Sequence, residues 1–228
     1  MAMTAPEPST RRGFLAVAAA VALLAFPRGA GAVIVGGPRD PVRRLLALAT
    51  RNAFARVTAP DGFWNSPVAR IALPVLFGRP GQPMRGVLAS RSFREQLQDR
   101  LNRFAEVGAR RAEPVVTAKL RRLVVANPAA VLGGEPTSAT TLLRAAVGPA
   151  LVNAMIPTLR RALHQAQDPI IAQAVAALKG VDLGDVAHAL ANEADNAIWY
   201  EVGAEEAAIR RNPEASGDPV LAAALRAR

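Results

Sequence analysis

The segment DGFWNSPVARIALP, residues 61–74, brings turn-forming, aromatic and polar residues together in one short part of the chain. Its prolines and glycine exclude one continuous helix. We expect a turn at Asp61–Gly62, a short helix from Ser66 or Pro67, and an extended exit at Leu73–Pro74. The segment therefore predicts a connector that follows the first helix and organises the fold. Its expected anchors are the polar side chains Asp61, Asn65 and Arg70 and the apolar side chains Phe63 and Trp64.

The composition favours helices over sheets. Of the 228 residues, 51% are hydrophobic, only 4% are aromatic and none is cysteine. A chain of this length buries a substantial core without disulfides, and abundant alanine with few aromatic residues is typical of packed helices. We therefore predict an all-α fold, an irregular multi-helix bundle of about 7–9 helices with proline-interrupted segments.

Asp-Pro or Asn-Pro marks several expected helix starts, because the first residue caps the helix and proline fits its first turn. Apolar residues at helical spacing then set the extent of each helix. The expected helices run from 41 to before 58, 90–112, from 114 onward, 128–133, 140–167 with interruptions at Pro149 and Pro157, 169–179, 182–211, and from 219 onward.

The N-terminus has the order of an export signal. Arg11-Arg12 precedes an apolar run over residues 13–26, and small residues follow up to Ala32. This run is too short to span a bilayer comfortably, and the arginine pair resembles a twin-arginine signal. We predict a twin-arginine-type signal peptide over residues 1–32, cleavage after Ala32 and a periplasmic location. Residues 33–228 are then a single helical domain without a transmembrane segment.

The formal net charge is +10, and 26 of the 28 basic residues are arginine. One interpretation is attraction to an anionic component of the cell envelope. The other is a coding bias that replaces lysine by arginine. No basic run exceeds two residues and aromatics do not alternate with arginines, so nucleic acid is not a favoured partner.

Sequence patterns of common catalytic and metal sites are absent. The chain has no cysteine and no Gly-x-Ser-x-Gly motif, and its two histidines, His164 and His188, lie in no metal-binding pattern. Gly133-Gly134 lacks the lysine of a phosphate-binding loop. We therefore predict no catalytic residue, no metal site and no cofactor, and the balance is against an enzyme.

One polar row is expected on the helix over residues 90–112, opposite its apolar stripe. We expect this row to be solvated, as charged faces of amphipathic helices usually are. The alternatives are that it binds arginines of another element or a cation. The row consists of Glu95, Asp99, Asn102 and Glu106.

Three further acids lie near the end of the last long helix. If the helix continues unbroken past Gly203, Glu201 and Glu205 lie on its apolar stripe and need partners or neutralisation. The favoured alternative is that Gly203 marks a bend that leaves both acids solvated. Glu206 and Arg210 have the i,i+4 spacing of an ion pair, worth only ~0.3–0.5 kcal/mol when exposed.

Four blocks of the sequence resemble one known family. They are DGF with Asn65, Pro67, Arg70-Ile71 and Leu73-Pro74; NRFAE at 102–106; Gly133-Gly134 with Ala139-Thr140; and EEAAIR at 205–210 with Asn212-Pro213. In this order they resemble the exported bacterial family called domain of unknown function 4197, over residues 41–213. The resemblance implies an exported, mostly helical protein and supplies no activity. The chain departs from the family pattern at Ser66, Phe104 and Asn196-Ala197.

The polar residues of these blocks are our candidate site. Two roles are open for them: ligand binding, or hydrogen bonding that holds the bundle in one arrangement. We also expect Arg70 to pair with Glu106 or Glu206. The candidates are Asp61, Asn65, Arg70, Asn102, Arg103, Glu106, Glu205, Glu206 and Arg210.

These observations favour a non-catalytic binding or scaffolding component of the cell envelope. One alternative is a carboxylate-dependent hydrolase of an envelope glycan, using Glu106 with Glu205 or Glu206 on either side of a cleft. A second alternative is an arginine-mediated binder of anionic envelope polymers.

Overall fold

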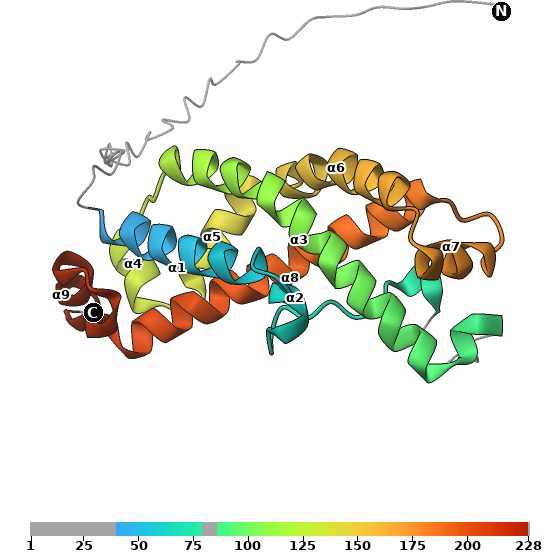
Figure 1. Cartoon of the computed structure of the whole chain (residues 1–228). Helices are drawn as coiled ribbons and strands as arrows, with labels where there is room; N and C mark the ends of the chain where they lie inside the picture. Colours follow the sequence, from blue (N-terminus) through green and yellow to red (C-terminus); the bar gives the residue numbers. More distant parts are fainter. Residues whose placement is uncertain (1–39, 79–85, 228) are drawn as a thin grey trace, which may run out of the picture. The chain divides into compact units, whose positions relative to one another are not determined.

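A computed structural model describes residues 40–78 and 86–227, which all belong to one compact unit, residues 33–228. Within these residues the chain forms only helices, so the all-α prediction is confirmed (Figure 1). The predicted signal peptide lies outside the described residues. The helices are α1 (Pro41–Val57), α2 (Gly62–Asn65), η1 (Val75–Phe77), η2 (Gly86–Ala89), α3 (Arg91–Arg121), α4 (Pro128–Gly133), α5 (Ser138–Val147), α6 (Ala150–Ala166), α7 (Pro169–Ala176), α8 (Leu183–Arg211), η3 (Pro213–Ser216) and α9 (Pro219–Arg226), where η denotes a 3-10 helix.

Four helices begin where aspartate caps predict. Asp40, Asp168 and Asp218 each accept hydrogen bonds from two amides of the following turn, and proline occupies the first helical position. Asp182 forms a capping box with Asp185 at the start of α8. The capping hydrogen bonds join residues that are close in sequence, which explains why these helix starts could be predicted.

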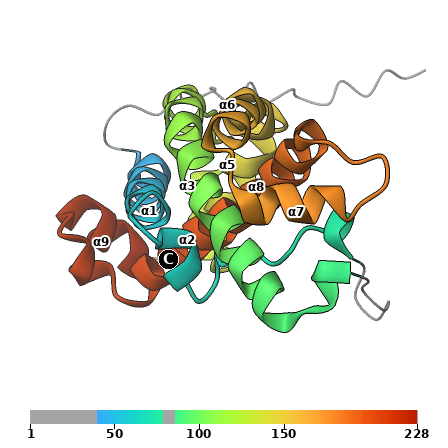
Figure 2. The same cartoon turned by 45° about the vertical axis from the view of Figure 1, so that its right-hand side comes forward.

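Helix α8 lies at the centre of the bundle. It packs against α1, α3, α5 and α6; in Figure 1 its C-terminal half runs below α1, and Figure 2 shows its N-terminal part beside α6. Over its C-terminal half the buried residues cover more than half of its circumference, and Tyr200 and Arg211 lie on the remaining exposed side. Helices α3 and α6 also pack closely, because Gly108 leaves room for Leu159: a Cβ at this glycine would lie 3.2 Å from Leu159 Cδ2.

Pro114 was expected to begin a new helix and Pro157 to interrupt one, but both lie inside continuous helices. Helix α3 continues through Pro114. Only one hydrogen bond of the helix is lost there, the proline is exposed, and the buried Ala112 and Val116 keep the helix on the core. Helix α6 likewise continues through Pro157, whereas the chain bends by 65° between α5 and α6 at Gly148–Pro149.

The connector at 61–74 also differs from expectation. Its short helix is Gly62–Asn65, one turn earlier than predicted, and it begins after Asp61 in a left-handed conformation with φ of 55°. A turn over residues 58–61 precedes this helix, so the predicted turn lies slightly earlier in the chain, and residues 71–74 lie outside any helix. Among the described residues no single helix has the length and apolarity needed to cross a membrane; α5 and α6 meet that criterion only as a bent pair.

Candidate functional site

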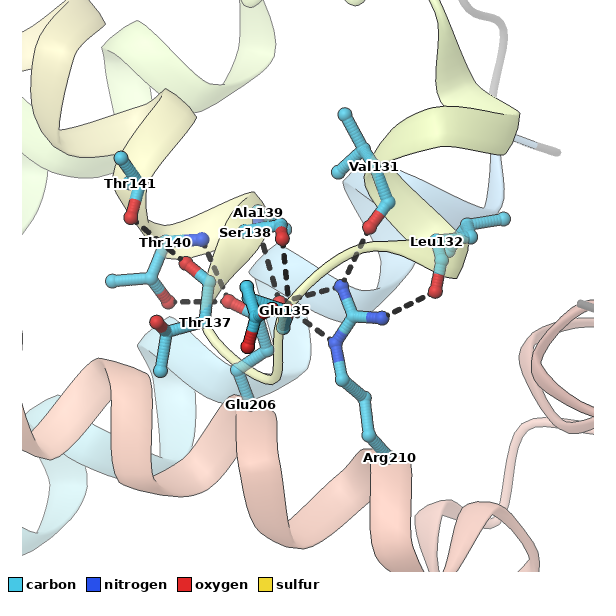
Figure 3. Close-up of polar contacts among 10 residues, drawn as sticks. All are labelled: Val131, Leu132, Glu135, Thr137, Ser138, Ala139, Thr140, Thr141, Glu206 and Arg210. Atoms are coloured by element: carbon cyan, nitrogen blue, oxygen red, sulfur yellow. Dashed lines mark hydrogen bonds and ion pairs between the residues drawn. The ribbon is translucent and has the colours of Figure 1, made fainter.

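Glu206 of α8 is completely buried and binds the first turn of α5. Its Oε1 accepts a hydrogen bond from the Ala139 amide at 3.1 Å, and its Oε2 accepts from the Thr140 amide and hydroxyl, both at 2.6 Å (Figure 3). Amides in the first turn of a helix have no partner within the helix. Thr137, the N-cap residue of α5, makes no side-chain capping bond, so Glu206 replaces the missing cap.

Arg210, one turn further along α8, binds the end of another helix. Its Nη1 and Nη2 donate to the carbonyl oxygens of Leu132 and Val131 at 2.6 and 3.0 Å, in the last turn of α4 (Figure 3). Its Nε and Nη2 donate to Glu206 Oε1 at 2.8 and 2.7 Å. The i,i+4 ion pair that the spacing predicts is present, and because Arg210 is only 4% exposed the pair is buried between three helices.

The charges of this pair match the dipoles of the helix ends that they touch. A carboxylate is favourable at a helix N-terminus and a guanidinium at a C-terminus. A buried ion pair is stable only if its remaining hydrogen-bonding atoms also find partners, and Glu206 accepts five hydrogen bonds. We call this group the α4–α5 junction; it consists of Val131, Leu132, Ala139, Thr140, Glu206 and Arg210.

A second polar group, the α1–α8 junction, contains Glu201 and Glu205, both buried. Arg56 of α1 reaches both acids: Nη1 lies 2.9 Å from Glu201 Oε1 and Nη2 lies 2.5 Å from Glu205 Oε1. Asn52 donates to Glu205 Oε2 at 3.2 Å, and the Ser66 hydroxyl donates to Glu201 Oε2 at 2.6 Å. The expectation that these two acids are solvated is therefore wrong.

The reason is the role of Gly203, which does not bend α8. A Cβ at this position would lie 3.1 Å from Thr137 Cγ2. The glycine thus permits close approach between α8 and the start of α5, and the helix continues unbroken to Arg211. Its apolar stripe carries Glu201 and Glu205 into the interior.

A third group, the α2–α3 junction, joins the segment 61–74 to α3. The buried Asn102 accepts from the Ile71 amide and donates to the Ile71 carbonyl, both at 2.9 Å. Gln98 donates to the same carbonyl at 2.8 Å. These side chains satisfy both backbone groups of a residue that lies outside any helix. Nearby, Arg103 Nε lies 3.3 Å from Asp61 Oδ1 in a more exposed ion pair.

Glu106 belongs to the same junction and is 6% exposed. Burial raises the pKa of Glu106 above its ordinary value, Arg110 lowers it in part, and the neighbouring Asp61 raises it further. Its Oε2 lies 3.7 Å from Arg110 Nη2, and Oε1 has no hydrogen-bond partner among the described residues. The polar row of α3 is therefore not uniformly solvated, since Asn102 and Glu106 are buried.

Two candidates lie outside these contacts. Arg70 is exposed, and its Cζ lies 3.4 Å from the centre of the Trp64 ring, which is a cation–π arrangement. The expected pairing of Arg70 with Glu106 or Glu206 is therefore wrong. Asn65 is exposed at the end of α2.

The sequence matches the family described as "protein of unknown function (DUF4197)" over residues 39–225. The chain belongs to this family. No curated protein and no solved structure is detectably similar to the chain. Membership in DUF4197 therefore establishes kinship and supplies no activity.

The blocks that resemble DUF4197 meet at the junctions. Block 61–74 packs on block 102–106 at the α2–α3 junction, and Ala139-Thr140 packs on block 205–210 at the α4–α5 junction. Most candidate residues thus lie in three separate groups of contacts, and the structure does not bring all nine together.

Sequence reasoning missed several residues that complete these groups. Arg56 is one of many arginines, and nothing local distinguishes it. The sequence does indicate a turn at Ser66, because serine before Pro67 favours one. In the structure the Ser66 hydroxyl accepts a hydrogen bond from the Ala69 amide at 2.9 Å. In the sequence, Thr140 is distinguished only as part of a family-like block. Its role depends on Glu206, which lies 66 residues away in sequence.

Open pockets occur on the described surface, and four have volumes of ≈ 820, ≈ 520, ≈ 470 and ≈ 420 Å³. Two flank the α4–α5 junction, one of them beside Arg210 and the other beside Thr140. The largest lies between α3 and α5, away from the family-like blocks. Within residues 40–78 and 86–227, no group of three acidic or histidine side chains is placed to hold a metal ion.

Proposed function

We propose that this DUF4197 protein is a non-catalytic binding or scaffolding component of the bacterial cell envelope. The observation that carries the proposal is the saturation of Glu206, whose two oxygens accept five hydrogen bonds. A catalytic carboxylate needs an oxygen available to substrate or water. Glu206 and Arg210 instead hold helix ends together, and Glu205 is bound by Arg56 and Asn52.

A glycan hydrolase would need two carboxyl groups about 5–10 Å apart across a cleft. Glu106 contacts residues near α2, whereas Glu205 contacts α1 and Glu206 contacts α5. In the part of the chain that the structure describes, none of these three acids lines any of the four pockets given above. Both observations weigh against the hydrolase.

The direct test is release of soluble fragments from purified envelope glycan. The protein is compared with a Glu106→Gln, Glu205→Gln double variant and with buffer. We expect all three to give the same background. Release that depends on wild-type protein and disappears in a folded double variant would refute the proposal.

Export rests on the N-terminal pattern. A twin-arginine signal depends on its arginine pair, so changing Arg11 and Arg12 to lysine should leave unprocessed precursor in the cytoplasm. Cell fractionation with detection of the chain measures this. Normal processing and export of the lysine variant would exclude the twin-arginine route, and it would leave the binding proposal untouched.

A further inference from the structure

The largest of the four pockets, ≈ 820 Å³, is a groove between the C-terminal end of α3 and α5. Its lining is mostly apolar and includes Leu123, Val124, Leu142 and Ala145. Val124 is 51% exposed and adds its side chain to this apolar surface. The groove therefore offers apolar surface to a ligand.

Hydrogen bonds from α1 fix the backbone that forms one wall of the groove. Arg43 of α1 donates to the carbonyl oxygens of Arg121 and Leu123 at 3.1 and 2.5 Å. Leu123 and Val125 are buried and fix the segment that follows α3. A preformed groove binds a ligand without the entropic cost of ordering a loop.

Two basic side chains line this groove. Lys119 and Arg122 are exposed, and neither forms an ion pair with an acid of the described residues. None of the ten lining residues is acidic. An apolar groove with unpaired positive charge is complementary to a molecule that has a hydrocarbon chain and an anionic head.

The size of the groove selects among such molecules. Its volume lies within the roughly 300–1,000 Å³ of small-molecule sites. A stable protein partner needs about 20–30 residues on each side, whereas ten line this groove. We propose that the groove binds a single-chain anionic amphiphile, a fatty acid whose chain lies along α5 and whose carboxylate lies between Lys119 and Arg122.

This inference rests on the proposed binding function and names its ligand class. The test is calorimetric titration of the full chain with octanoate, decanoate and dodecanoate below their micellar concentrations. Each added methylene should strengthen binding about two- to fourfold if it enters the groove. Affinity that does not depend on chain length would overturn the proposal.

Charge variants test the head-group contact. Lys119→Gln with Arg122→Gln should weaken decanoate binding about fivefold, since two exposed ion pairs are lost, and should leave decanol binding unchanged. The control Arg51→Gln with Lys179→Gln removes the same net charge from exposed positions off the groove. Equal loss in both double variants would assign the effect to net charge and refute the site.

A blocking variant tests the location. Ala145→Trp fills the groove and should reduce decanoate affinity at least tenfold, while Ala55→Trp, on an exposed position of α1, should not. Unchanged binding by Ala145→Trp would refute the groove as the site. Glycan release and cell fractionation are separate readouts, so failure of fatty-acid binding is distinguishable from failure of the non-catalytic or exported assignment.

Discussion

Replacing Glu206 by glutamine tests whether the α4–α5 junction holds the bundle together. Both oxygens of Glu206 face donors: Oε1 faces Arg210 and the Ala139 amide, and Oε2 faces the Thr140 amide and hydroxyl. Glutamine has one oxygen and one NH₂ group. In either orientation the NH₂ group therefore opposes a donor, although the side chain has the same size.

The expected loss follows from burial. Removing one partner of a buried ion pair costs about 3–5 kcal/mol, because the other charge stays buried without compensation. Arg210 keeps its bonds to two carbonyl oxygens of α4, so we expect about 3 kcal/mol for Glu206→Gln, near the lower end of that range. A domain with about 5–15 kcal/mol of stability remains folded after such a loss.

Glu205→Gln is the matched control on the same helix. Its ion-pair partner, Arg56, is 52% exposed in its side chain, so this pair is screened by solvent and worth about 0–1 kcal/mol. Urea unfolding followed by circular dichroism gives both free energies of unfolding. Equal small losses in the two variants, below about 1 kcal/mol, would refute the argument that the buried pair holds the junction.

Three further changes test the other contacts. Asn102→Asp keeps the acceptor for the Ile71 amide but places an oxygen against the Ile71 carbonyl. Urea unfolding should show a loss of about 1–3 kcal/mol in the free energy of unfolding. A loss near zero would contradict the role of Asn102 in holding Ile71. Gly62→Ala puts a Cβ 2.1 Å from a backbone oxygen of α1 and should cost about 1–3 kcal/mol. Gly133→Ala should cost nothing, because a Cβ there lies within 4 Å of no described residue beyond its chain neighbours and its own helix. Hydrogen bonds to Asp218 lower its pKa below the ordinary 3.8; the largest contribution comes from an amide in the first turn of α9 and the next from an arginine of α1. The stability that the ionised Asp218 contributes is therefore present above about pH 4 and is lost as the pH falls below that value. Asp218→Asn should flatten unfolding free energy against pH in that acid range, and an unchanged slope would contradict this assignment.

The helix starts could be predicted because their causes are local. Asp40, Asp168, Asp182 and Asp218 each cap amides two or three residues away. Such caps are visible in sequence as aspartate before proline or before an apolar stripe. The all-α class followed from composition, which is also independent of tertiary contacts.

The polar contacts could not be predicted, because their partners are distant in sequence. Glu206 and Thr140 are 66 residues apart, and Asn52 and Glu205 are 153 apart. Spacing alone predicts the pair of Glu206 and Arg210, but nothing local shows that two helix ends bury it. The sequence predicts a bend at Gly203 for the same reason, because the contact of Gly203 with Thr137 is tertiary and leaves no local pattern.

The positions of the three junctions explain why an alanine-rich bundle needs buried polar groups. Alanine side chains are small and pack against one another in many registers, so apolar packing alone discriminates weakly between arrangements. A buried donor or acceptor without its partner is costly, so each junction penalises arrangements in which the wrong segments meet. Asn102 selects Ile71, and Glu206 with Arg210 selects the facing ends of α5 and α4. Polar residues used in this way are already bound by the protein itself. A ligand site is therefore better sought where charges form no ion pair within the described residues, as with Lys119 and Arg122 on the groove between α3 and α5.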